Sequence, residues 1–265
     1  MLFRSLALLA LCLSAAAEAP LKSEVLPAPR NGGVYVLCHR GAHEDRPENT
    51  LAAYQRGIDL GADYVEIDLR TTKDGEIVSV HNGTVDSYTK DAKGKVADFT
   101  LAELKAMDIG SRVDPKWKNE RIPTFDEILT LCKGKIGIYL DLKDADPALL
   151  IKMIQQYGME KSVVWYCDPE QHHFVKKTCA DCITMPDPGP ETNLAALIAE
   201  FQPKVVASAW GEFSETFVKT CHAAGAVVVV DESDPTCWEP LVAWGTDGIQ
   251  TDHPEKLIAW LKSRK

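Results

Sequence analysis

The chain has 265 residues and a formal net charge of −10 at pH 7, with 39 acidic side chains against 29 lysines and arginines. This acidic balance argues against a nucleic-acid partner, because phosphate backbones favour basic protein surfaces. No internal repeat, low-complexity tract or block of charge divides the chain, and its length suits one large domain.

The first residues have the pattern of a secretory signal peptide. Arg4 is the only charged side chain before Glu18, and residues 6–13 are almost wholly apolar. Three alanines before Glu18 offer a small-residue cleavage site, and the apolar run is too short to span a bilayer. We therefore predict a signal peptide over residues 1–17, a proline-bearing linker over 18–33, no stable membrane insertion, and a secreted or periplasmic protein.

Eight short apolar runs follow, each succeeded by an amphipathic stretch of helical period. Strands that alternate with helices indicate an α/β fold, and eight such pairs are the count of a (β/α)8 TIM barrel. The predicted strands are residues 34–38, 64–69, 136–142, 163–167, 183–185, 205–209, 226–230 and 248–251. We predict one TIM-barrel domain over residues 34–265.

One further apolar run, residues 76–81, does not fit this count. Only a few residues around Lys73, Asp74 and Gly75 join it to the second predicted strand. Parallel neighbours need a crossover of about a dozen residues or more, so this run is expected to form a hairpin arm. We place it in a long insertion, residues 71–123, between the second strand and its helix, where long loops commonly carry function.

Reactive side chains follow the predicted strands at the end where TIM barrels carry their active sites. They are His39 and Arg40 after the first strand, Glu66 and Asp68 on the second, Asp141 and Lys143 on the third, and His81 at the end of the hairpin arm. Glu66 and Asp68 are two residues apart, so they face the same side of a strand. Two carboxylates on one face of an apolar strand repel each other unless a cation lies between them.

The three carboxylates Glu66, Asp68 and Asp141 form an all-oxygen set that suits one divalent cation, Mg²⁺ or Ca²⁺. The alternative is that Asp141 pairs only with Lys143, which points the same way. Metal binding is favoured, because three inward carboxylates need more positive charge than one lysine supplies.

His39 and His81 are predicted to be an acid–base pair, because imidazole can be protonated or neutral near neutral pH. Two histidines and an arginine beside the acids suggest phosphate chemistry with a metal. Hydrolysis of a phosphodiester would need one group to remove a proton from the attacking oxygen and another to protonate the leaving alkoxide. Arg40 and Lys143 would hold the phosphate oxygens. The attacker is water or the substrate's own neighbouring hydroxyl. In the loop after Arg40, we expect His43 to be solvated and Asn49 to cap the first helix.

These residues resemble the glycerophosphodiester phosphodiesterase family. The matching motifs are HRGA at 39–42, PENTLAA at 47–53, GAD at 61–63, EID at 66–68, TKDG at 72–75, TLAEL at 100–104, RIPT at 121–124 and GTDGIQTD at 245–252. The resemblance implies a TIM barrel with an insertion after its second strand. It also implies hydrolysis of a small-molecule glycerophosphodiester to an alcohol and glycerol 3-phosphate, with catalytic histidines at His39 and His81.

The chain departs from the pattern of that family at four places. Asp141 stands where the family has glutamate, Asn82 where it has aspartate, residues 165–167 (WYC) where it has Ser-Ser-Phe, and Asp231 where it has tryptophan. The last two positions are expected to line the pocket for the alcohol portion of the substrate. The identity of that alcohol is therefore the part of the prediction that the resemblance supports least.

Two other functions are kept as alternatives. A phospholipase D-like or sphingomyelinase-like enzyme would use the same groups on a (lyso)phospholipid and would need an exposed apolar loop. A non-catalytic phosphate- or sugar-binding relative would be expected to lose a histidine or an acid, and none is lost here. Outside the reactive set, Cys179 and Cys182 could form a local disulfide in an oxidising compartment.

Overall fold

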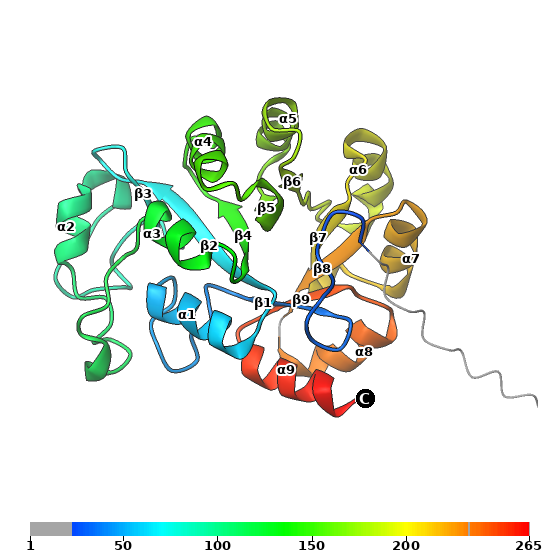
Figure 1. Cartoon of the computed structure of the whole chain (residues 1–265), viewed down its shortest axis with the longest axis horizontal. Coiled ribbons are helices and arrows are strands. Elements are labelled where there is room, and N and C mark those ends of the chain that lie inside the picture. The colour runs from blue at the N-terminus through cyan, green and yellow to red at the C-terminus, as the bar shows by residue number, and fades with distance from the viewer. Residues whose placement is uncertain (1–22, 233, 265) are drawn as a thin grey trace, which may run out of the picture.

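Helices surround a barrel of strands in the computed structural model, which describes residues 23–232 and 234–264 (Figure 1). The predicted signal peptide, residues 1–17, lies outside the described residues. The strands are β1 (Tyr35–Cys38), β2 (Tyr64–Thr71), β3 (Ile77–Ser79), β4 (Gly137–Leu142), β5 (Val163–Tyr166), β6 (Ile183–Thr184), β7 (Val205–Ala209), β8 (Val227–Asp231) and β9 (Gly248–Thr251). The helices are α1 (Leu51–Leu60), α2 (Leu101–Ala106), α3 (Phe125–Cys132), α4 (Pro147–Tyr157), α5 (Pro169–Thr178), α6 (Leu194–Phe201), α7 (Glu215–Ala223), α8 (Trp238–Ala243) and α9 (Pro254–Ser263).

The parallel strands lie in the order β6-β5-β4-β2-β1-β9-β8-β7. Neighbours along this path pair in parallel register, and the amide of Ala207 donates to the carbonyl of Pro186 at 3.0 Å across the remaining seam between β6 and β7. The eight parallel strands of the described chain thus form a nearly closed barrel. The TIM barrel predicted from the sequence is confirmed.

Side chains on the strands alternate between two apolar layers. On β2, Val65, Ile67 and Leu69 pack in the layer between the strands and the helices. Tyr64 packs inside the barrel with Tyr35 and other residues from β1, β4, β5, β7 and β8. Because strand side chains alternate, the carboxylates that follow Tyr64 at spacing two also face the barrel interior.

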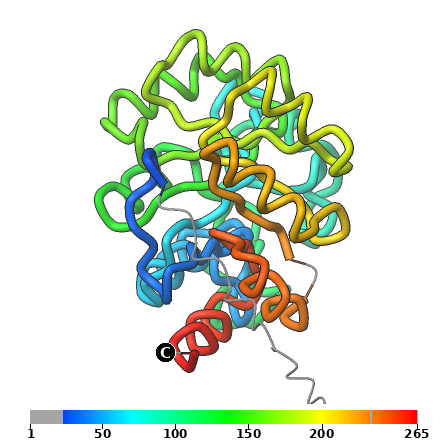
Figure 2. The backbone as a smooth tube through the Cα atoms, turned by 90° about the vertical axis from the view of Figure 1, so that its right-hand side faces the viewer, coloured from blue at the N-terminus to red at the C-terminus, as the bar shows by residue number. Residues whose placement is uncertain are grey.

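Residues 23–33, which form the blue segment at the left of Figure 2, cover the end of the barrel that lies opposite the predicted reactive groups. Leu26 is 8 % exposed and packs in the interior cluster with Tyr35 and Tyr64. The hydroxyl of Tyr35 donates to the carbonyl of Pro27 at 2.7 Å. These residues fall within the predicted linker, and they therefore cover the apolar interior at that end of the barrel.

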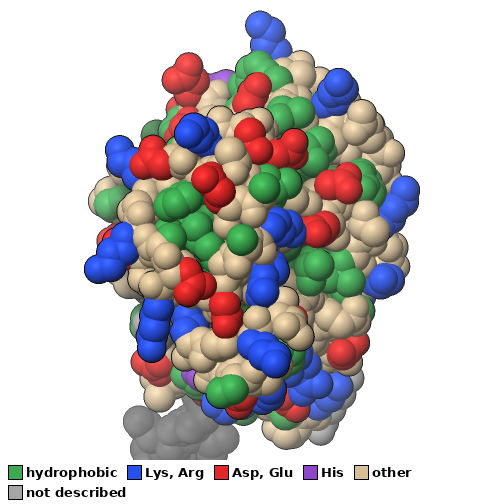
Figure 3. All heavy atoms as spheres, turned by 90° about the vertical axis from the view of Figure 1, so that its left-hand side faces the viewer, with side chains coloured by type: hydrophobic (Ala, Val, Ile, Leu, Met, Phe, Trp, Pro, Cys, Tyr) green, Lys and Arg blue, Asp and Glu red, His purple; other side chains and the backbone are tan. Residues whose placement is uncertain are grey.

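The segment between β2 and α3 projects to one side of the barrel. In it, β3 pairs antiparallel with β2, so that Leu69 lies opposite Ser79. The segment has its own apolar cluster, formed by Val78, Val80, Val85, Tyr88, Val96, Leu104, Met107, Ile109 and Ile122. On this side of the molecule, charged side chains of both signs surround small apolar groups (Figure 3).

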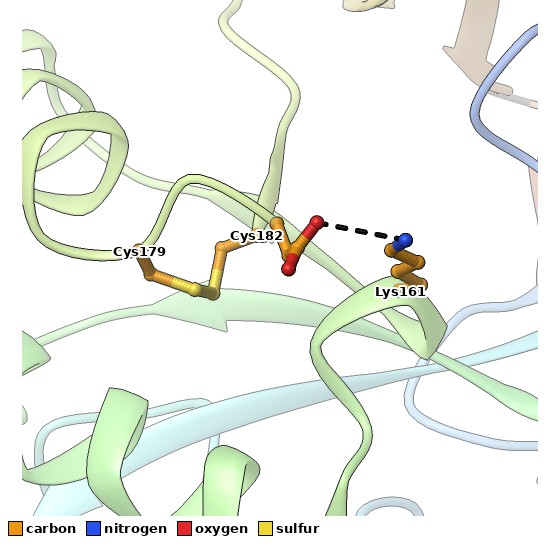
Figure 4. Close-up of a disulfide and its surroundings, with 4 residues drawn as sticks. Lys161, Cys179 and Cys182 are labelled. Atoms are coloured by element: carbon orange, nitrogen blue, oxygen red, sulfur yellow. Dashed lines mark ion pairs between the residues drawn. A yellow bond between two sulfur atoms is a disulfide. The ribbon is translucent and has the colours of Figure 1, made fainter.

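A disulfide joins Cys179 and Cys182 in the loop between α5 and β6 (Figure 4). The ion pair drawn beside it connects Lys161 Nζ to Asp181 Oδ1 at 3.5 Å. The local disulfide that the cysteine spacing allows is therefore present in the structure. No helix among the described residues is long and apolar enough to cross a membrane.

Candidate active site

The predicted reactive side chains surround one pocket of about 240 Å³ at the carboxyl ends of the barrel strands. Its lining includes His39, Arg40, Glu66, Asp68, His81 and Asp141, together with Tyr139, Tyr166, Asp187, Ser208, Asp231 and Gln250. Lys143 is next to this lining, in contact with Asp141 and Asp68. The structure thus brings all seven sequence-predicted site residues together.

Glu66, Asp68 and Asp141 converge because β2 and β4 are parallel neighbours in which Asp68 lies opposite Asp141. One carboxylate oxygen from each of the three lies within 4.8 Å of the others. Glu66 and Asp68 are only 2 % and 1 % exposed. Burial, with Asp68 and Asp141 close by, raises the pKa of Glu66 well above its usual range. Burial also raises the pKa of Asp141, against the opposing charge of Lys143.

The cations near this cluster do not balance it. Lys143 Nζ lies 2.6 Å from Asp141 Oδ2 and 3.1 Å from Asp68 Oδ1. Arg40 Nη1 lies 3.2 Å from a fourth carboxylate, Glu48, and its Nε lies 3.9 Å from Asp68. Four carboxylates therefore face one lysine and one arginine. The donor set, all oxygen and short of positive charge, fits a divalent cation.

The loop between β1 and α1 has a constrained backbone that directs an amide toward this cluster. Arg40, Gly41 and Asn49 have φ values of +50°, +81° and +52°, in the left-handed region. A Cβ at Gly41 would lie 2.7 Å from the Cβ of Ala53, so only glycine fits there. The turn directs the amide of Arg40 to Glu66 Oε2, to which it donates at 2.6 Å.

Asn49 does not cap α1, contrary to the expectation from sequence. Thr50 is the cap, and its side chain accepts a hydrogen bond from the amide of Ala53. The Asn49 amide instead donates to Asp68 Oδ2 at 2.8 Å, and its oxygen accepts from the hydroxyls of Tyr54 and Ser79. Because Thr50 accepts the hydrogen bond from the helix terminus, the Asn49 side chain is left to bond the buried carboxylate of Asp68.

His81 is held over the cluster through its backbone. The amide of Val80 donates to the carbonyl of Asp68 at 2.9 Å, which continues the antiparallel arm beyond β3. The guanidinium of Arg70 donates to the carbonyl of His81 at 2.7 Å and pairs with Asp144, also at 2.7 Å. The ring Nδ1 of His81 lies 2.9 Å from Asn82 Oδ1. An amide oxygen only accepts, so Nδ1 is the donor in this hydrogen bond and Nε2 is left for other partners.

His39 is oriented by a carboxylate that sequence reasoning missed. Its Nδ1 lies 2.8 Å from Asp252 Oδ1, and His43 Nε2 lies 3.0 Å from the same oxygen. Hydrogen bonds from these two rings lower the pKa of Asp252. His43 is therefore a partner of Asp252 and not a solvated residue, contrary to expectation. The signal that could have found Asp252 is its place directly after β9, the parallel neighbour of β1.

Comparisons with known proteins identify the family to which the chain is similar. The model of the glycerophosphoryl diester phosphodiesterase family matches residues 39–148. A glycerophosphodiester phosphodiesterase of Caldanaerobacter subterraneus subsp. tengcongensis is 31% identical over 246 residues, which cover 84% of this chain and 96% of that protein. A glycerophosphodiester phosphodiesterase of Bacillus subtilis is 25% identical over 251 residues, 84% of each chain.

Solved structures share the fold. A glycerophosphodiester phosphodiesterase from Agrobacterium tumefaciens superposes with a TM-score of 0.77 at 24% identity, over 85% of this chain and 99% of that one. A phosphodiesterase from Oleispira antarctica, solved with the product sn-glycerol-3-phosphate, gives a TM-score of 0.79 at 23% identity, over 86% and 96%.

Fold, site and relatives together define a phosphoric diester hydrolase built on a TIM barrel. Within that class, the chain belongs to the glycerophosphodiester phosphodiesterase family.

Proposed function

We propose that this enzyme hydrolyses glycerophosphodiesters to an alcohol and glycerol 3-phosphate, with His39 and His81 as the acid–base pair. One observation carries the proposal: two histidines and a three-carboxylate cluster line a single pocket at the carboxyl ends of the strands. Each histidine has its Nδ1 bonded to an oxygen acceptor, which leaves Nε2 for the reacting atoms.

In the reaction, one histidine removes a proton from the attacking water or hydroxyl while the oxygen of that nucleophile bonds to phosphorus. The other histidine gives a proton to the alkoxide oxygen as the bond from that oxygen to phosphorus breaks. Arg40 and Lys143 lie beside the cluster and would hold phosphate oxygens. Attack by water and attack by the substrate's own neighbouring hydroxyl, through a cyclic phosphate, both fit this arrangement.

Glu66, Asp68 and Asp141 would hold one divalent cation, Mg²⁺ or Ca²⁺, which would stabilise charge on the phosphate oxygens. The fit rests on the charge shortfall of the cluster and on the raised pKa of Glu66. Without the cation, the ion pairs of Asp68 and Asp141 within the described part of the chain are those with Lys143 and Arg40.

The test is a turnover screen over glycerophosphodiesters and lysophospholipids with chelated protein and after addition of Mg²⁺ or Ca²⁺. We expect release of glycerol 3-phosphate that requires the ion and is lost in Asp68→Asn. Asp181→Asn, an exposed acid in the α5–β6 loop, is the control and should keep full turnover. Release of no phosphomonoester from any diester by ion-loaded protein would overturn the proposal.

The phospholipase-like alternative finds less support. The insertion, which the structure describes throughout, buries its apolar side chains in its own cluster, and Val113, at 42 %, is its only large hydrophobic residue that is strongly exposed. That face carries charges of both signs between its small apolar groups (Figure 3). Turnover of lysophospholipids but not of glycerophosphodiesters in the same screen would reverse this preference.

We also propose a secreted or periplasmic location after removal of residues 1–17. The Cys179–Cys182 disulfide supports it, because such bonds persist in oxidising compartments. N-terminal sequencing of protein recovered from the medium or periplasm should begin at Glu18. Recovery of the full-length chain from the cytoplasm alone would contradict the location.

A further inference from the structure

One side of the pocket carries hydrogen-bond acceptors that the proposed mechanism does not use. Tyr166 comes from β5, Asp187 follows β6, Asp231 ends β8 and Gln250 lies on β9. The acid cluster comes from β2 and β4 instead. We call these four residues the acceptor wall. A substituent of the phosphate that points away from the acid cluster would meet this wall.

Among the described residues, no lysine or arginine lies within ion-pair distance of either carboxylate of the acceptor wall. Asp187 accepts hydrogen bonds from the Tyr166 hydroxyl at 3.1 Å and from the amide of Gly189 at 2.7 Å. Burial raises the pKa of Asp187. Burial also raises the pKa of Asp231, against the charges of His39 and the more distant Arg40 and a hydrogen bond from Gln250. Within residues 23–232 and 234–264, neither acid forms an ion pair with a lysine or arginine. A cationic ligand would supply the charge that is missing.

Gln250 provides an independent observation. Its side chain lines the pocket although the residue is only 5 % exposed, and its Oε1 has no hydrogen-bond partner among the described residues. A buried carbonyl oxygen without a donor costs about 1–3 kcal/mol, so such groups are usually satisfied, here by a ligand donor. The wall thus needs hydrogen-bond donors as well as positive charge.

We infer that the acceptor wall binds a primary ammonium group on the alcohol portion of the substrate, so that amino-alcohol esters of the ethanolamine type are preferred. A primary ammonium has three N–H donors and one charge, which matches Asp187, Asp231 and Gln250 Oε1. A quaternary ammonium has the charge without the donors, and a neutral polyol has donors without the charge. Asp231 stands where the family pattern has tryptophan, so this acid distinguishes the chain. The inference rests on the proposed function.

The test compares kcat/KM for glycerophosphoethanolamine, glycerophosphocholine and glycerophosphoglycerol. We expect wild type to prefer the ethanolamine ester by about tenfold or more, the usual range for a charge-assisted hydrogen bond. Asp187→Asn and Asp231→Asn should each remove most of that preference, because turnover of the ethanolamine ester should fall by a larger factor than turnover of the other two esters. Asp181→Asn should change none of the three. Equal losses for all esters, or an unchanged preference in both variants, would overturn the inference.

Binding separates this inference from the proposed function. Calorimetry with ion-loaded His81→Ala protein should show tighter binding of glycerophosphoethanolamine than of glycerophosphocholine, and Asp231→Asn in that background should equalise them. If wild type turns over no ester, the proposed function fails while this binding difference still supports the ammonium site. Equal affinities for the two esters would overturn the site whatever the turnover.

Discussion

Asp252 is the carboxylate that two histidines of the active-site face share. It bonds His39 Nδ1 at 2.8 Å and His43 Nε2 at 3.0 Å, although its own side chain is 54% exposed. A carboxylate on Nδ1 fixes the tautomer and ring orientation and stabilises the protonated ring. We therefore interpret Asp252 as a positioning residue that acts through His39.

Asp252→Asn should lower kcat about tenfold to a hundredfold with little change in KM, because the ring loses a charged partner but keeps a hydrogen-bond acceptor. His43→Gln is the control, because it removes the second ring and keeps the His39 contact. A kcat equal to that of wild type would argue that Asp252 is only structural.

The two histidines can be assigned by changing the leaving group. His39→Ala and His81→Ala should each lower turnover of an ordinary glycerophosphodiester by about 10²–10⁴-fold, the usual worth of a positioned acid or base. A nitrophenyl leaving group needs little protonation, so it should rescue only the variant that lacks the acid. Near-normal turnover of an alkyl ester by either variant would remove that histidine from the mechanism.

At the scale of the elements, the sequence predicted the contacts that strand alternation and parallel pairing determine. Glu66 and Asp68 share a face because strand side chains alternate, and Asp141 joins them because β4 pairs beside β2. Sequence reasoning missed Asp252 and the role of Asn49, because both depend on contacts between distant segments. His39 and Asp252 lie 213 positions apart and meet only because β1 and β9 are neighbours in the barrel.

Helix α5 contains a buried group that should make stability depend on pH. His172 is 1 % exposed, and neither ring nitrogen has a hydrogen-bond partner among the described residues. Burial lowers the pKa of His172 to about 4, with Asp168 opposing. In the unfolded chain the pKa is about 6.5. Between these values the unfolded state binds a proton that the folded state does not, so stability falls as pH falls through this window.

His172→Leu should remove this dependence. Relative to the variant, wild type should lose about 2 kcal/mol of unfolding free energy between pH 7 and pH 5, as the pKa difference implies. Urea unfolding at the two pH values measures the change. His173→Gln, at an exposed neighbour in the same helix, should behave like wild type. A pH-independent difference between His172→Leu and wild type would show that His172 titrates normally in the folded state.

At the scale of the whole molecule, the apolar interior cluster and the reactive carboxylates lie at opposite ends of the barrel. At one end, Leu26 packs against Tyr35 and Tyr64 and covers the apolar interior. At the opposite end, buried carboxylates lie close together. Burying Glu66 and Asp68 opposes folding, since each charge loses hydration and repels the other. The structure without an ion therefore has a local electrostatic cost at the active-site end that the rest of the barrel must offset.

That cost predicts that a divalent cation stabilises the entire domain. An ion that binds only the folded state adds about 2.7 kcal/mol at about 100 times its Kd. For a domain of this size, that corresponds to a rise in Tm of about 5–10 °C. Thermal denaturation with Mg²⁺ or Ca²⁺ should show this concentration-dependent rise over chelated protein. It should be reduced in Asp141→Asn, nearly absent in Asp68→Asn and unchanged in Asp181→Asn.

Chelated Asp68→Asn and Asp141→Asn should melt no lower than chelated wild type, because each substitution removes repulsion from the crowded cluster. A simple structural pairing of these acids with Lys143 predicts the opposite, since either substitution would then cost an ion pair in the absence of metal. The two explanations thus differ in the sign of the Tm change of metal-free protein. A wild-type Tm that neither ion changes, in protein first shown to be metal-free, would favour the ion pair and leave Arg40 and Lys143 as the partners of the cluster.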